Sequence, residues 1–111
     1  MTTIFERVQT ALSGLGVPVE NGQIEGKLPE TYIVWQVISA PVEQEADNKL
    51  ISKLQYVQVN TWSRRGAVAY PDVETAMTTA GFDYESGRDL AYSETSKHYG
   101  YGMDFTYLEE K

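Results

Sequence analysis

The sequence predicts an α+β fold: a small, mostly antiparallel sheet with two helices packed on one face, in the order α-β-β-α-β-β. Hydrophobic residues recur at helical spacing in two segments. In four other segments they alternate with polar residues or form short continuous runs, as they do in strands. The chain has 111 residues, of which 41% are hydrophobic, which is enough for one core. We therefore expect residues 1–111 to form a single domain.

A first helix is predicted over residues 3–15. One face of this segment carries its large aliphatic side chains, Ile4, Val8, Leu12 and Leu15. Thr3 and Glu6 have the spacing of a capping box, in which each side chain accepts a hydrogen bond from the other residue's backbone N–H. Three helix-breaking residues then end the helix: Gly14, Gly16 and Pro18.

Residues 17–30 contain turn-forming glycines and prolines with little periodicity, so we expect a long connection there. Residues 32–38 are β-branched and aromatic with apolar side chains at odd and even positions, which is typical of a strand covered on both faces. The acidic stretch from Pro41 to Asp47 is expected to end this strand as a solvated loop.

A second strand is expected over residues 50–62. One face of this strand carries Val57, Val59 and Thr61. The other face carries Tyr56, Gln58, Asn60 and Trp62. A second helix is predicted over residues 68–80, with Pro71 in its first turn, where the missing N–H costs little. Gly81 suits the left-handed position after a helix, and Phe82 can make the hydrophobic contact that accompanies it.

Two further strands complete the predicted sheet. The shorter spans residues 89–93 and follows a turn at residues 85–88. The longer spans residues 98–108, where one face carries Tyr99, Tyr101, Met103, Phe105 and Tyr107. Gly100 and Gly102 thin the opposite face, so we expect close packing over it, with the contacts made by a partner's side chains or backbone.

Composition excludes several classes of function. The absence of cysteine removes disulfide scaffolds and thiol nucleophiles, and a single histidine, His98, cannot form a poly-histidine metal site. A net charge of −7 with scattered basic residues disfavours a general nucleic-acid binder. No apolar run is long enough to span a membrane and no signal peptide is evident, so we expect a protein made and kept in a cytosol, or released by lysis.

The sequence holds no catalytic, cofactor-binding or metal-binding signature. The serines near His98, with Asp89 or Asp104 as an orienting carboxylate, are more typical of turn formers and caps than of a Ser-His-Asp unit. The acidic groups lack the glycine turn and terminal bidentate acid of a calcium loop. We therefore expect no enzyme activity and no cofactor.

The aromatic side chains indicate more about function than the polar ones do, because the chain contains eight tyrosines, two tryptophans and three phenylalanines. A small sheet with helices on one face cannot bury them all, and Tyr and Trp are enriched at protein interfaces. The alternative is a tyrosine-rich core. We favour an interface, with these candidate residues: Trp35, Tyr56, Trp62, Tyr99 and Tyr101.

The succession of segments resembles a known family. A strand at residues 55–63 is followed by a helix that ends at Gly81-Phe82, then by residues 89–95 and an alternating strand that opens at His98. Over residues 4–108 this succession resembles the tail terminator, or tail-to-head joining, proteins of long-tailed phages and prophages of Gram-positive bacteria. The resemblance implies a structural protein, a small α+β subunit that assembles as a sixfold ring and caps the tail tube.

The resemblance also implies partners and a location. The partners are further copies of the chain, the tail tube protein and the head completion or connector protein, at the head–tail junction of the virion and in the host cytoplasm before assembly. DNA passes through the channel without specific binding, and acids facing the lumen would repel its phosphates. We therefore expect Glu43, Glu45 and Asp47 near the lumen or the tube-facing rim, and residues 17–30 to be a second contact that orders on assembly.

Two rival interpretations remain. One is another component of the same junction, such as a head-completion or minor capsid protein. The other is a small ligand-binding or enzymatic domain that uses its aromatic face as a pocket.

Overall fold

The computed structural model describes residues 3–46 and 49–110, and the side chains of residues 39–53 and 109–110 lie outside the description. Its elements, in chain order, are α1 (Ile4–Leu12), β1 (Val19–Asn21), β2 (Thr31–Ala46), β3 (Lys49–Ser63), α2 (Val73–Thr79), β4 (Asp83–Ser93) and β5 (His98–Glu110). Short 3-10 helices occupy Ser13–Leu15 and Ala67–Ala69. The α+β class is confirmed, whereas the predicted order lacks one strand, β1.

The five strands form one mixed sheet in the order β1-β2-β3-β5-β4. Three neighbouring pairs are antiparallel, and β1 is parallel to β2. The carbonyl of Pro18 accepts from Ile33 N–H at 2.9 Å, and Gly22 N–H donates to the carbonyl of Trp35 at 2.8 Å. Part of the expected connection is therefore an edge strand, and only residues 22–30 carry the chain back to the start of β2.

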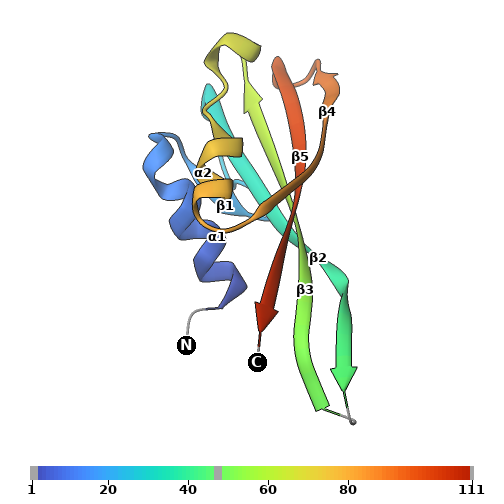
Figure 1. The fold of residues 1–111 in the computed structure, drawn as a ribbon. Coiled ribbons are helices and arrows are strands. Elements are labelled where there is room, and N and C mark those ends of the chain that lie inside the picture. The colour runs from blue at the N-terminus through green and yellow to red at the C-terminus, as the bar shows by residue number, and fades with distance from the viewer. Residues whose placement is uncertain (1–2, 47–48, 111) are drawn as a thin grey trace.

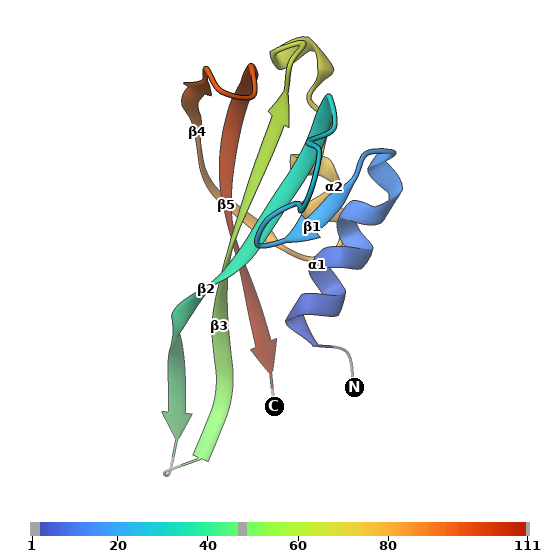
Figure 2. The same cartoon turned by 180° about the vertical axis from the view of Figure 1, so that it is seen from behind.

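Both helices cover the same face of the sheet (Figures 1 and 2). The core between helices and sheet consists of Ile4, Val8, Leu12, Ile33, Trp35, Val57, Val59, Val73, Met77, Phe82 and Phe105. The predicted capping box of α1 is present, with Thr3 and Glu6 bonded to each other's backbone N–H. The last residues of the predicted helix tighten into the 3-10 turn Ser13–Leu15, which ends at Gly16 with φ +77°.

The second helix is shorter than predicted at its start. The side chain of Asp72 accepts a hydrogen bond from Thr75 N–H at 3.1 Å, so the helix begins at Val73 and Pro71 precedes its cap instead of lying in its first turn. The predicted ending is confirmed. Gly81 has φ +99°, its N–H and that of Phe82 bond back to the last turn, and Phe82 is buried.

The strands β2 and β3 are longer than predicted and continue beyond the end of β5 as an arm, which we define as Glu43–Ala46 paired with Lys49–Lys53 (Figure 1). At its base, Ser52 and Lys53 also pair with β5. The expected loop at residues 41–47 is therefore wrong for Glu43 and Glu45, whose backbone lies in β2. A register shift between Ile38 and Val42 accommodates Pro41, which has no N–H to donate. The arm makes the molecule long, with extents of 52 × 25 × 24 Å.

The predicted turn at residues 85–88 is also wrong, because these residues lie within β4. An irregularity in register between Tyr84 and Ser86 absorbs one extra residue and keeps the strand paired with β5. Gly87 was one reason to predict a turn, but in the structure it lets two tyrosine side chains pack closely against the backbone of β4. A Cβ at this position would overlap the hydroxyl groups of Tyr84 and Tyr101.

Candidate interface on the uncovered sheet face

The face of the sheet opposite the helices is mostly uncovered. Alternation along the paired strands places on it Val34, Gln36, Ile38, Leu54, Tyr56, Gln58, Asn60, Trp62, Ser86, Arg88, Leu90, Gly100, Gly102, Asp104, Thr106 and Leu108. This face divides along the strands into three zones.

The zone near the start of β5 is closed by side chains of the same chain. The indole of Trp62 lies over Gly100, where an added Cβ would sit 2.5 Å from its Cζ3. Asn60 lies over Gly102 in the same way, with its Oδ1 2.8 Å from an added Cβ. Close packing over the two glycines is therefore present, but the expectation that a partner would supply it is wrong, because the neighbouring strand β3 of the same chain supplies the packing groups.

The middle zone is a band of hydrogen-bonded polar side chains running across the strands. Gln36 Nε2 donates to Gln58 Oε1 at 3.0 Å, and Asp104 Oδ2 accepts from both Arg88 Nη1 and Ser86 Oγ at 3.0 Å. The ion pair of Arg88 with Asp104 is partly exposed, so it adds little to stability, but it cancels both charges. At this ion pair the band is therefore polar and locally neutral.

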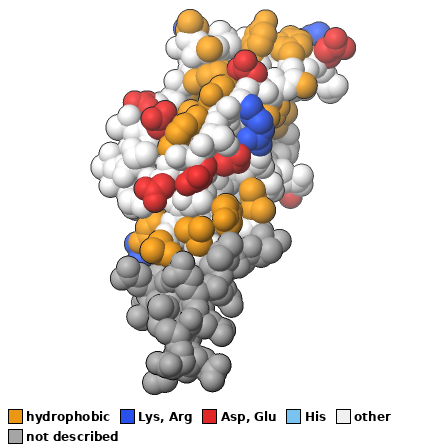
Figure 3. Space-filling model, turned by 45° about the vertical axis from the view of Figure 1, so that its right-hand side comes forward, with side chains coloured by type: hydrophobic (Ala, Val, Ile, Leu, Met, Phe, Trp, Pro, Cys, Tyr) orange, Lys and Arg blue, Asp and Glu red, His pale blue; other side chains and the backbone are white. Residues whose placement is uncertain are grey.

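The third zone, which we call the lower patch, is apolar and consists of Ile38, Leu54, Tyr56 and Leu108. Ile38 pairs with Tyr56, and Leu54 pairs with Leu108, so the four residues form two adjacent rows. Ile38 is 41% exposed and Leu108 is 48% exposed. Figure 3 shows hydrophobic side chains gathered directly above its grey region, below a band that is mostly acidic. Of these four residues, the sequence analysis identified only Tyr56 as a candidate. They share a face of the sheet, to which β2, β3 and β5 each contribute.

Exposed aromatic residues also gather on the helix side, at the opposite end of the molecule. Tyr92 and Tyr99 are each about half exposed and their ring centroids lie 4.7 Å apart. Tyr101 lies deeper and is hydrogen-bonded to the hydroxyl of Tyr84. The pKa of Tyr84 is raised, mainly by desolvation and secondly by this hydrogen bond. Of the five candidate aromatic residues, Tyr99 therefore offers the most surface.

Trp35 is a core residue. It is 2% exposed, and its Nε1 donates to Gln9 Oε1 of α1 at 3.1 Å. It therefore has no surface left for a partner. Among the three candidate acids, the backbone of Glu43 and Glu45 lies in the arm, their side chains lie outside the described part, and Asp47 lies outside the described residues.

Three successive carbonyls, of residues 28–30, hold the end of the β1–β2 connection. The carbonyl of Leu28 accepts from the Arg64 guanidinium, that of Pro29 lies 2.8 Å from His98 Nε2, and that of Glu30 accepts from Arg64 N–H. The ring of His98 is fully buried against Tyr32, whose pKa is raised by burial despite nearby Arg64. His98 therefore serves packing, and no catalytic pair with a serine is formed in the described part of the chain.

Other kinds of site find little support in the described residues. No three His, Cys, Asp or Glu side chains there gather into a possible metal site, and no helix there is long and apolar enough to cross a membrane. An open depression lies between the helices, lined by Glu6, Arg7, Thr10, Ala11 and Ala80. It is open to solvent, unlike the enclosed pockets that bind small molecules.

Comparison with models of known protein families and with curated protein sequences finds no match to this chain.

Proposed function

We propose that this chain is a structural protein of the head–tail junction of a long-tailed phage or prophage. In this role it is a tail terminator, which assembles as a ring on the end of the tail tube and joins the tail to the head connector. It acts by binding other proteins, without catalysis or a cofactor.

The observation that carries this proposal is the uncovered sheet face with half-exposed apolar side chains at its lower end. A sheet with a hydrophobic face is stable when that face is packed against another layer. Here the helices supply one layer only, and Ile38 and Leu108 of the lower patch stay exposed. Such residues suit a subunit that is completed by neighbouring proteins.

The shape and charge of the chain agree with this role. Its radius of gyration of 15.2 Å exceeds the value of about 13 Å expected for a compact domain of this length. A net charge of −7 suits a channel through which DNA slides without sticking. The acids of the arm, Glu43 and Glu45 with Asp47, are proposed to lie near the lumen or the tube-facing rim.

Deletion of the gene from its phage tests the role. Tails of uncontrolled length, or finished tails that do not join heads, are expected, because the missing ring normally stops the tube and presents the joining surface. Heads that lose their DNA while tail length stays normal would indicate a head-completion protein instead. Normal virions would refute both roles.

Replacing Glu43, Glu45 and Asp47 with lysine tests the placement of the acids. We expect slower DNA passage and unchanged ring formation, measured by DNA ejection and by electron microscopy. Loss of the rings would show that these residues serve assembly instead.

A further inference from the structure

We propose that the free edge of β4 binds an extended segment of another protein that carries lysine or arginine side chains. The segment adds to the sheet as a further strand beside residues 86–90, and its bases face the acids of β4. The inference goes beyond the proposed function, because it rests on the edge of the sheet and its charges, whatever role the chain has.

The strand β4 lies at the edge of the sheet and has one neighbour. The sheet order places β5 on one side of β4, and no described strand pairs with its other side. Figures 1 and 2 show β4 at the outside of the sheet. None of its 11 residues is buried. The backbone N–H and C=O groups along this edge can therefore pair with another strand, which is how extended peptides add to sheets.

Residues 86–90 are the part of β4 that suits such pairing. From Ser86 to Leu90 the strand keeps one register with β5, and register shifts bound this stretch, between Tyr84 and Ser86 on one side and between Leu90 and Ser93 on the other. Its length is close to that of an average strand, about 5–6 residues. The stretch contains neither proline nor lysine, which commonly protect strand edges from pairing. It therefore offers a template for one short added strand.

The opposite edge of the sheet is less available. Its strand, β1, has only 3 residues, Val19–Asn21. The carbonyl of Val19 also accepts a hydrogen bond from Gln9 Nε2 of α1 at 3.3 Å, so a side chain of the same protein occupies an acceptor of this strand. Of the two edges of the described sheet, β4 is therefore the long and open one.

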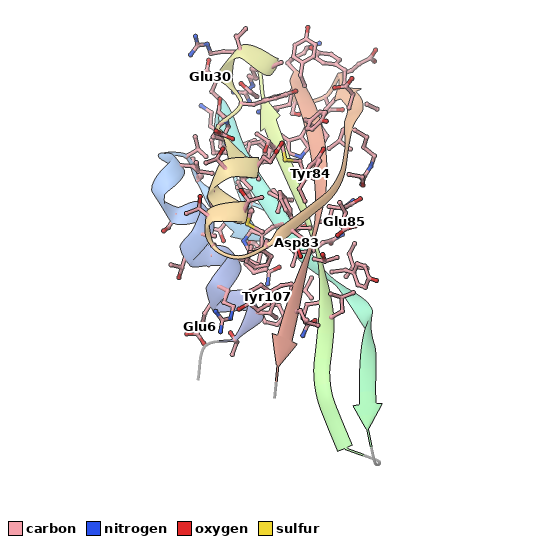
Figure 4. All side chains as sticks on the ribbon, viewed as in Figure 1. Glu6, Glu30, Asp83, Tyr84, Glu85 and Tyr107 are labelled. Carbon is pink, nitrogen blue, oxygen red and sulfur yellow. The ribbon has the colours of Figure 1, made fainter. Side chains whose placement is uncertain are left out.

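The charges along β4 favour a basic partner. Asp83, Glu85 and Asp89 are exposed, and no described base forms an ion pair with them. The one base of the strand, Arg88, is already paired with Asp104 at 3.0 Å. Figure 4 shows Asp83 and Glu85 close together near the start of β4. Opposite charges on neighbouring strands stabilise their pairing and like charges destabilise it, so a segment with lysine or arginine fits this edge.

Exposed tyrosine rings border the same edge. Tyr84 and Tyr92 of β4 are 39% and 43% exposed, and Tyr99, whose ring packs on Tyr92, is 50% exposed. The face of a tyrosine ring attracts the cationic head of lysine or arginine, and the ring packs against the apolar stem of these side chains. The rings therefore favour the same kind of partner as the acids do.

A second copy of β4 does not fit this edge. Two antiparallel β4 strands centred on Gly87 would place Glu85 of each copy opposite Asp89 of the other, and a pairing centred on Ser86 would place Asp83 opposite Asp89. Two copies that each carry −7 also repel one another. These charges favour a different protein as the partner.

Synthetic peptides test the proposal with the full chain. The probe is a blocked peptide of about seven residues in which valine alternates with lysine. At saturation it should slow the hydrogen exchange of the amides on the free edge of β4 at least about tenfold and leave β1 unchanged.

Two further peptides separate charge from strand pairing. With glutamate in place of lysine, the peptide should bind at least about tenfold more weakly, because like charges then meet. With proline in place of valine, the lysine peptide keeps its charge but cannot pair as a strand, so it should also bind at least about tenfold more weakly.

A charge reversal in the protein tests the acids. Asp89→Lys should weaken binding of the lysine peptide at least about fivefold and strengthen binding of the glutamate peptide, and Asp89→Asn should lie between this variant and the wild type. Glu20→Lys is the matched control: it makes the same change of charge at an exposed residue of β1 and should bind both peptides like the wild type. Circular dichroism verifies that each variant is folded.

Several results would overturn the inference. These are a lysine peptide that does not bind at millimolar concentration, equal binding of the glutamate or the proline peptide, protection that appears at β1, and equal binding by Asp89→Lys and Glu20→Lys. Protection of β4 that grows with protein concentration in the absence of peptide would show that a second copy occupies the edge, and it also overturns the inference. None of these measurements depends on the result of deleting the gene, which tests the proposed function separately.

Discussion

Replacing Gly100 with alanine measures how closely Trp62 packs on the uncovered face. The new Cβ would lie 2.5 Å from Cζ3 and 2.6 Å from Cε3 of Trp62, whereas carbon atoms in contact are about 3.5–4.0 Å apart. The indole must therefore move by about 1 Å. Overpacking of this kind costs about 1–3 kcal/mol, and removing a flexible glycine from a strand returns about 0.5–1 kcal/mol. We expect a net loss of about 1–2 kcal/mol.

For a chain of 111 residues, the unfolding entropy near the midpoint is about 0.23 kcal/mol/K, so this loss lowers Tm by about 4–9 °C. Thermal unfolding followed by circular dichroism and tryptophan fluorescence measures it. Gly14→Ala is the matched control, because nothing lies within 4 Å of its added Cβ, and it should be at least as stable as the wild type.

A second variant isolates the cause. In a Trp62→Leu background the ring is gone, so Gly100→Ala should cost little. An unchanged Tm for Gly100→Ala in the wild type, or the same loss in both backgrounds, would refute the packing argument.

Three further variants test the elements around the sheet. Gly81→Ala should cost about 1–2 kcal/mol in urea unfolding, because φ is +99° at that position, and an unchanged midpoint would contradict this. Burial raises the pKa of Tyr32, so its neutral form stabilises the fold below the ordinary tyrosine value of about 10, and this contribution is lost as the pH rises through the folded-state pKa. As the pH rises above about 10, Tyr32→Phe should therefore lose less free energy of unfolding than the wild type does. Identical dependence of stability on alkaline pH in the two proteins would contradict a raised pKa of Tyr32. Arg64→Met removes the guanidinium donors to Leu28 and Ser96, so trypsin should cleave after Lys27 faster; equal cleavage rates would show that these bonds do not hold the connection.

Local patterns in the sequence predicted the features that depend on neighbours in the chain. The capping box of Thr3 and Glu6, the left-handed Gly81 after α2, and the alternation along β3 and β5 are all present. Each depends on groups within a few residues or on the period of two along a strand. The first element ends at its expected position, although its last three residues, Ser13–Leu15, form a 3-10 turn instead of α-helix.

Features that depend on distant partners were missed. The strand β1 has only three residues and exists because the exposed edge of β2 pairs with it. Pro41 and Gly87, which indicate a loop and a turn by local rules, lie inside long strands because register shifts absorb the irregularity. The lower patch was missed for the same reason. Ile38 and Leu108 are far apart in sequence and meet only through the pairing of β2 with β3 and of β3 with β5.

The sequence by itself determined the α+β class, the helix caps and which residues share a strand face, because these follow from short-range hydrogen bonds and side-chain periodicity. Only the tertiary structure decided which face the helices cover. Trp35 and Trp62 stand on similar aromatic strands, yet α1 buries the first in the core and the second lies on the uncovered face over Gly100. Burial is a property of what packs against a strand, and that is set by contacts between residues far apart in the chain.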